Sequence, residues 1–137
     1  MTYLIGIDLG GTKCSVILGG TKRLGSGFQT SKSLDDFFIT EKIAFPMPTN
    51  NPAETIRLIS GAVKQLLDRH DFKIEQILAA GISCGGPLDS QKGIILSPPN
   101  LPGWDEIQIT DILEKEIGIR PVLQNDANAC AIAELKW

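Results

Sequence analysis

Short apolar runs punctuated by glycine and proline dominate the first third of the chain, a pattern typical of buried strands joined by turns. Residues 3–10 are rich in isoleucine and leucine and end in a glycine pair, so they predict a buried strand and a tight turn. Residues 13–18 predict a second strand that ends at Gly19 and Gly20 and completes a β-hairpin. Residues 37–45 predict a third strand, closed by prolines.

An amphipathic helix follows these strands. Asn51 is placed to cap its first turn, Pro52 suits the first helical position, and Glu54 can reach back to the cap amide. We expect the helix to run to about His70, whose position at the helix end indicates a structural role. Its apolar face is formed, at helical spacing, by Ile56, Ile59, Val63, Leu66 and Leu67.

The remainder of the chain alternates strands with helices. Thr110 is expected to cap a short helix that closes at Gly118, and an alanine-rich helix is expected from Asp126 onward. Antiparallel strands followed by alternating helix and strand indicate a mixed α/β sheet with flanking helices. The other expected elements are strands at residues 77–83, 93–96 and 121–124 and an ordered loop at 97–103.

Composition and charge argue against several classes of protein. Apolar residues make up 42% of the 137 residues, which suits one ordinary domain with a core. The chain has 16 acidic and 13 basic residues, and the basic residues form no continuous run. Since proteins that bind nucleic acid usually carry a basic surface, we expect no nucleic-acid partner. The three cysteines are scattered, which fits a reducing compartment. No apolar stretch approaches the ~20 residues that cross a bilayer, and no signal segment is visible, so we expect a cytoplasmic protein without membrane contact.

The strongest local motif is the turn after the first strand. Gly10 and Gly11 let the backbone approach a phosphate closely and expose successive amides to it. Thr12 adds a hydroxyl and Lys13 a positive charge, while Asp8 can hold a hydrated Mg²⁺ beside the same phosphates. The alternative is a plain hairpin turn that contains two glycines. Neither the full P-loop motif nor the dinucleotide-binding motif occurs, so those two kinds of phosphate site are disfavoured. Gly20 and Gly25 have the P-loop spacing, but Ser26 stands where that motif requires lysine.

Two further polar clusters follow buried strands. Asp126 would face the crevice beyond the strand ends and can accept a proton from a substrate hydroxyl, with Asn125 orienting the substrate. The alternative there is a helix N-cap, and the two roles are compatible. Gly86 permits close approach of a ligand, and Asn100 offers polar contacts on a loop braced by prolines. The alternative for this second cluster is ordinary turn chemistry, with Trp104 packing as a lid on the core.

Taken together, four strings in this order resemble the N-terminal half of ROK-family proteins: GIDLGGTK at residues 6–13, GISCGGPLD at 81–89, SPPNLPGW at 97–104 and NDANACAIAE at 125–134. The resemblance implies the actin-like ATPase (ribonuclease H-like) fold, with a hexose or N-acetylhexosamine between two lobes and ATP with Mg²⁺ bound mainly by the second. It implies Asp126 as the catalytic base and Gly86, Asn100 and Asn125 as sugar contacts, for in-line attack on the γ-phosphoryl group. It implies a phosphate loop made of Asp8, Gly10, Gly11, Thr12 and Lys13.

The resemblance also divides the chain. Residues 1–124 would form the N-terminal lobe and residues 125–137 the start of an interlobe helix. That helix has no stop signal, so we expect a truncated chain that is inactive alone and a homo-oligomer that covers its apolar surface. The family's second nucleotide loop, its further sugar-binding residues and its zinc site would lie beyond Trp137. Residues 21–36 look like an insertion relative to the family.

Two other functions stay open. The family includes sugar-responsive transcriptional repressors, which carry a winged helix-turn-helix before the phosphate loop, whereas here that loop begins at Asp8 in an acidic chain. A truncated lobe that binds sugar without catalysis is the second alternative. Glucose, fructose and N-acetylated hexosamines all fit as the sugar.

Overall fold

The structure of the chain is a computed structural model. It describes residues 2–21, 37–48 and 50–125. Two expected features lie outside the described residues. One is the insertion at 21–36, of which only Thr21 is described, and the other is the helix expected from Asp126 onward.

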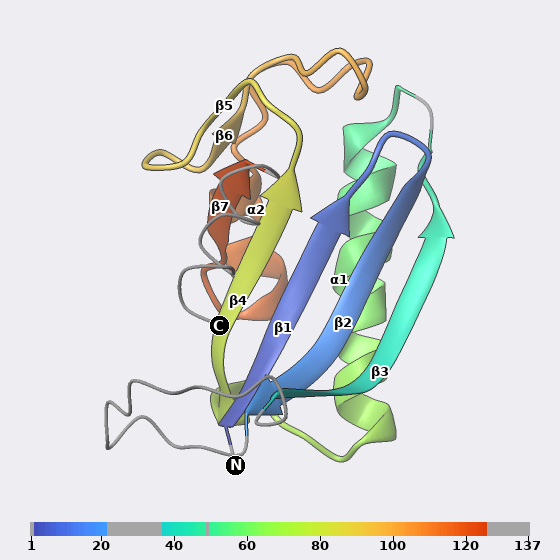
Figure 1. Ribbon diagram of the computed structural model, residues 1–137, viewed down its shortest axis with the longest axis vertical. Helices are drawn as coiled ribbons and strands as arrows, with labels where there is room; N and C mark the ends of the chain where they lie inside the picture. Colours follow the sequence, from blue (N-terminus) through green and yellow to red (C-terminus); the bar gives the residue numbers. More distant parts are fainter. Residues whose placement is uncertain (1, 22–36, 49, 126–137) are drawn as a thin grey trace.

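A five-stranded sheet with the strand order β3-β2-β1-β4-β7 forms the centre of the molecule (Figure 1). β1 pairs antiparallel with β2, and β2 with β3, whereas β4 runs parallel to β1 and β7 runs parallel to β4. The sheet is therefore mixed, which confirms the predicted class. Its strands are β1 (Thr2–Leu9), β2 (Lys13–Thr21), β3 (Phe37–Pro46), β4 (Ile77–Cys84) and β7 (Val122–Asn125).

Helices α1 (Pro52–Arg69) and α2 (Ile109–Ile117) lie behind the sheet in Figure 1, on one face of it. Along β1, Ile5, Ile7 and Leu9 are buried in alternation because successive side chains of a strand point to opposite faces. All five apolar positions predicted for α1 are buried as well, which confirms its amphipathic face. The core residues on the strands of this sheet are Ile5, Ile7, Leu9, Cys14, Val16, Leu18, Ile77, Ala80, Ile82, Cys84 and Leu123.

The N-terminus of α1 is capped as predicted. The Asn51 Oδ1 atom accepts a hydrogen bond from the Glu54 backbone N–H at 3.1 Å, and Pro52 takes the first helical position. The Glu54 carboxylate pairs with Arg57 one turn further on, so the prediction that it reaches back to the cap amide is wrong. The helix ends with His70 as its C-cap, at the end of the sheet opposite the β1–β2 turn. None of the helices in the described parts of the chain has the length and apolarity to cross a membrane.

β2 runs to Thr21 and so continues past the predicted end at residue 18. The two glycines that suggested a turn lie inside the strand. A Cβ atom on Gly19 would lie 2.6 Å from the Phe38 carbonyl oxygen, and one on Gly20 would lie 2.1 Å from the Thr2 carbonyl oxygen. These glycines therefore mark close approach between backbones and not the end of a strand.

The start of α2 also differs from the prediction. Gln108 is the N-cap residue, and Thr110 lies inside the first turn, where it is buried. The Thr110 hydroxyl is 3.5 Å from the Gly93 carbonyl oxygen, so it bonds to a neighbouring loop and caps nothing. Gly118, with a φ of 88°, ends the helix as predicted.

Three short elements complete the described fold. β6 (Ile94–Ile95) lies within the strand predicted at residues 93–96 and pairs antiparallel with β5 (Leu88–Asp89), which the sequence did not indicate. η2 (Ile74–Gln76) is a single 3₁₀ turn between α1 and β4. Because β1, β4 and β7 are parallel, their carboxyl ends all lie at one edge of the sheet, where the predicted polar clusters occur.

Candidate functional site

The turn from β1 to β2 is closed by a backbone hydrogen bond. The Gly10 N–H donates to the Lys13 carbonyl oxygen at 3.0 Å. A Cβ atom on Gly10 would lie 2.8 Å from that same oxygen, so the closed turn requires glycine there. Asp8, Thr12 and Lys13 are all exposed, which leaves their polar groups accessible to a ligand.

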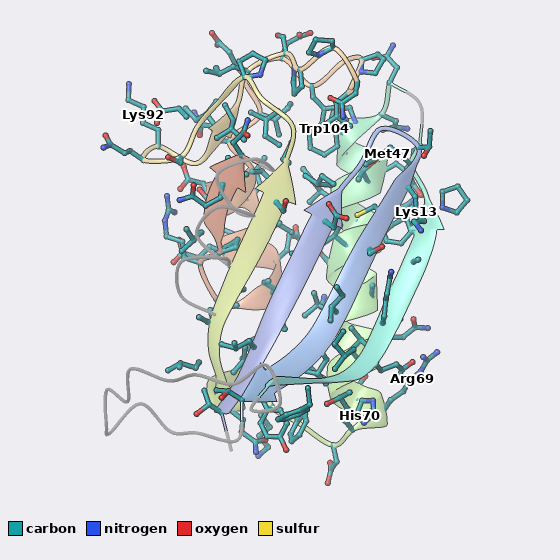
Figure 2. The ribbon with its side chains drawn as sticks, in the orientation of Figure 1. Lys13, Met47, Arg69, His70, Lys92 and Trp104 are labelled. Carbon is teal, nitrogen blue, oxygen red and sulfur yellow. The ribbon has the colours of Figure 1, made fainter. Side chains whose placement is uncertain are left out.

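The turn is tied to the start of α1 by the segment after β3. The Met47 N–H donates to the Thr12 carbonyl oxygen at 2.9 Å. The buried Thr55 hydroxyl of α1 lies 3.4 Å from the Met47 sulfur and 3.1 Å from the Asn51 carbonyl oxygen. Figure 2 shows Met47 and Lys13 at the same end of the molecule as Trp104. The turn therefore rests on the end of a capped helix.

The carboxyl ends of β4 and β7 meet at a second polar cluster. Asn125 is the register partner of Cys84, at the last position of β4. A Cβ atom on Gly86 would lie 2.6 Å from the Asn125 Nδ2 atom, so the side-chain amide of Asn125 lies directly against this glycine. An open cavity of about 410 Å³ is lined by Pro87, Leu88, Ser90, Gln124 and Asn125.

The loop at residues 97–104 brings Asn100 between these two clusters. The Ser97 N–H donates to the Trp104 carbonyl oxygen at 2.9 Å, and the Leu101 N–H donates to the Pro98 carbonyl oxygen at 3.0 Å. Leu101 and Trp104 are each 1% exposed and anchor the loop in the core. The expected ordered loop is thus confirmed, and so is the interpretation of Trp104 as a lid on the core.

The structure gathers most of the predicted site residues at one edge of the sheet. The β1–β2 turn, Gly86, Asn100 and Asn125 all lie there. Asp126, the predicted catalytic base, directly follows Asn125 and lies outside the described residues. The ligand-binding roles of all these residues stay predictions.

A cavity beside the turn was not predicted from the sequence. It measures about 240 Å³, and its lining includes Gly11, Met47, Asn50, Asn100 and Trp104. Asn50 has a φ of 53°, a left-handed conformation that asparagine tolerates better than most residues. The only signal in the sequence is the asparagine pair at residues 50–51, of which Asn51 alone is interpreted, as a helix cap.

The carboxylate of Asp8 is available to a magnesium ion. Asp8 is exposed at the end of β1, beside the backbone turn. One carboxylate together with substrate phosphates and water is a usual magnesium environment, so the residues present fit the ion. Within the described residues, no group of three or more His, Cys, Asp or Glu side chains could hold a metal by itself.

Neither of the two cysteines among the described residues is suited to act as a nucleophile. Cys14 and Cys84 are buried, and Cys130 lies outside the described residues. Burial, and secondly the negative charge of Asp8, raise the pKa of the Cys14 thiol to about 12. Since the thiolate is the reactive form, Cys14 stays protonated and inert at neutral pH.

His70 lies far from this edge of the sheet. Its Nε2 atom is 2.9 Å from the Glu41 Oε1 atom, and Glu41 also forms an ion pair with Arg69. Figure 2 shows Arg69 and His70 at the opposite end of the molecule from Lys13. This placement supports the structural role expected for His70.

Comparison with known proteins gives matches along nearly the whole chain. The model of the ROK family matches residues 4–137. A glucokinase from Thermotoga maritima is 32% identical over 134 residues, which is 98% of this chain and 36% of the relative. A glucokinase from Streptomyces coelicolor is 29% identical over 137 residues, covering 37% of the relative. A xylose repressor from Caldicellulosiruptor bescii is 25% identical over 134 residues, covering 30% of the relative.

The fold has close counterparts among solved structures. A ROK hexokinase from Thermus thermophilus superposes with a TM-score of 0.72 at 28% identity, over 97% of this chain and 38% of that one. A ROK-family transcriptional regulator, a homologue of the Escherichia coli MLC protein, superposes with a TM-score of 0.73 at 15% identity and shows the shared fold alone. The chain therefore has the actin-like ATPase fold and spans little more than a third of the length of these kinases.

Proposed function

The chain belongs to the ROK family, and on that premise we propose that it is the N-terminal lobe of a sugar kinase that transfers the γ-phosphoryl group of ATP to a hexose. In this proposal residues 1–124 would form the lobe and residues 125–137 would lead into the interlobe helix, so the chain alone would not turn over. The relatives named glucokinase make D-glucose the first substrate to test.

One observation carries the proposal: a glycine turn suited to phosphate and the polar strand ends suited to a hydroxyl-rich ligand are adjacent. The Asn100 backbone oxygen would lie 3.1 Å from a Cβ atom on Gly11, and its side-chain amide would lie 3.4 Å from one on Gly85. A phosphate at the turn and a sugar at the strand ends would therefore be neighbours. This adjacency is what in-line transfer between them requires.

The turn is suited to hold the phosphates. The Gly10 amide closes the turn, so the Gly11 and Thr12 backbone amides and the Lys13 ammonium would supply the donors and the positive charge. Asp8 would hold Mg²⁺, and the bound ion would neutralise the negative charge that develops on the phosphates. Because the transition state of phosphoryl transfer is loose, positioning and charge neutralisation contribute more than the strength of the base.

The strand ends are suited to hold the sugar. Asn100 and Asn125 offer both donors and acceptors to hydroxyl groups. The missing side chain of Gly86 leaves room for the Asn125 amide, which a Cβ atom there would meet at 2.6 Å. Asp126 would accept the proton of the attacking hydroxyl. In that step the hydroxyl oxygen bonds to the γ-phosphorus, and the bond from that phosphorus to the bridging oxygen of ADP breaks.

A sugar-responsive regulator is the second candidate, because a xylose repressor is among the relatives that match the chain. Both candidates predict sugar binding, and only the kinase predicts ADP release. The test uses the protein expressed from the whole reading frame that contains this chain. D-glucose affinity is measured by titration calorimetry, and ADP release is measured by a coupled assay.

The kinase predicts glucose-dependent ADP release that falls about 10²–10⁴-fold in Asp126→Asn, since general base catalysis contributes about that much. Glucose affinity should change far less in this variant. Glucose binding without ADP release would favour the regulator and reject the kinase. Absence of both, across a panel of hexoses and N-acetylhexosamines, would reject both candidates.

A further inference from the structure

Asn100 lies between two glycines that come from different parts of the sheet. On one side, a Cβ atom on Gly11 would lie 3.1 Å from the Asn100 carbonyl oxygen and 3.2 Å from its Cβ atom. On the other side, a Cβ atom on Gly85 would lie 3.4 Å from both Nδ2 and Oδ1 of Asn100. Asn100 therefore bridges the phosphate turn after β1 and the strand end after β4.

Gly11 is the tighter of these two contacts. The distances to Gly11 involve the backbone oxygen and Cβ of Asn100, which cannot rotate away, whereas those to Gly85 involve the end of the side chain. The loop is fixed in the core at Leu101 and Trp104. The cavity of about 240 Å³ beside Gly11 and Asn100 leaves space into which the loop tip could shift.

We propose that Gly11 is a positioning residue for the sugar subsite: its missing side chain lets Asn100 take the position from which the Asn100 amide reaches the sugar. This inference rests on the proposed function. It gives Gly11 a second role, separate from the exposure of its backbone to phosphate. Because the sugar contact and the phosphate turn share the Gly11–Asn100 contact, each ligand should also affect the affinity of the other by the same factor.

Alanine at position 11 is the decisive substitution. The described glycines with positive φ are Gly93, Gly103 and Gly118, and Gly11 is not one of them. Alanine can therefore adopt the backbone conformation of Gly11, and the variant should fold. The added methyl group forces Asn100 to give way by a few tenths of an ångström. Loss of one well-placed hydrogen bond to the sugar corresponds to about a fivefold weaker affinity.

The experiment measures the dissociation constant of D-glucose without nucleotide, by titration calorimetry on the full chain and on the protein from the whole reading frame. Gly11→Ala should weaken glucose binding about fivefold. Gly61→Ala is the matched control, since nothing lies within 4 Å of a Cβ atom at this exposed helix position. Gly10→Ala is a comparison within the turn, because its methyl group would meet the Lys13 backbone and not Asn100. Its main effect should fall on nucleotide affinity.

A double-mutant cycle tests whether Gly11 acts through Asn100. If it does, Gly11→Ala should weaken glucose binding in the wild-type background and add little in the Asn100→Ala background. Unchanged glucose affinity in Gly11→Ala, or effects that simply add, would overturn the inference while wild type still binds glucose. Failure of the wild-type protein from the whole reading frame to bind any hexose or N-acetylhexosamine would instead overturn the proposed function, together with the inference that rests on it.

Discussion

The loop that carries Asn100 depends on a buried leucine, so Leu101→Ala is a direct test of how the site is supported. Leu101 is 1% exposed and follows Asn100 immediately. It lines the same cavity of about 240 Å³ as Gly11 and Trp104. Removing its side chain takes away the anchor nearest to the predicted sugar contact.

The expected cost follows from burial and from the neighbouring cavity. Buried Leu→Ala substitutions cost ~2–5 kcal/mol, and the cost grows with the volume of the void that remains. Here the new void would join space that already exists beside the loop, so relaxation is easier than in a closed core. We therefore expect a loss of about 2–3 kcal/mol, against a total stability that is typically about 5–15 kcal/mol for a domain.

Leu78→Ala is the matched control. Leu78 lies in β4 and is 71% exposed, so the same chemical change there should shift stability by less than about 0.5 kcal/mol. Urea unfolding followed by far-UV circular dichroism gives both free energies by linear extrapolation. Equal losses in the two variants would refute the view that the loop is anchored through Leu101.

The remaining predictions concern the helix cap, the ion cluster and the cysteine. Asn51→Ala should lower the free energy of unfolding by about 1 kcal/mol in urea titrations, whereas Asn51→Asp should retain most of it; no loss in the alanine variant would contradict the cap. The hydrogen bond from His70 lowers the pKa of Glu41 below its ordinary 4.5, and the hydrogen bond and positive charge of Arg69 lower it further. The stabilisation from Glu41 should therefore be present at neutral pH and be lost as acid titrates Glu41 through its lowered pKa. In Glu41→Gln, the free energy of unfolding should therefore fall less steeply as the pH is lowered through this range. An unchanged dependence of stability on pH would contradict the contact of Glu41 with His70 and Arg69. Cys14 should resist iodoacetamide at pH 8 in the folded chain and react in urea, as mass spectrometry would show.

Local patterns predicted most of the fold. The strands at β1, β3, β4 and β7 and the helix α1 were predicted because each carries a strong apolar period and clear end signals, such as Asn51 and Pro52 before α1. The errors arose where tertiary contacts override a local signal. Gly19 and Gly20 suggested a turn, but the neighbouring backbones need them inside β2. Thr110 suggested a cap, but its hydroxyl bonds to a loop that is distant in sequence.

The candidate site was predictable in its residue types but not in its internal contacts. Asn100 is separated from Gly11 by most of the chain, and no periodicity or spacing indicates that the two touch. Parallel pairing of β1 with β4 brings the turn after β1 beside Gly85 at the end of β4. The loop that follows β6 then places Asn100 against both Gly11 and Gly85. The cavity beside Asn50 likewise depends on the left-handed turn before α1, which composition does not encode.

Phosphorus NMR tests the central claim most directly. The protein expressed from the whole reading frame is incubated with ATP, Mg²⁺ and D-glucose, and then with the other hexoses and N-acetylhexosamines. The account predicts ADP resonances together with a new phosphomonoester resonance for one of these sugars, and neither signal in Asp126→Asn within the same time. A sugar that binds while ATP stays intact would contradict it, and would leave this lobe as a sugar-binding module of the same fold.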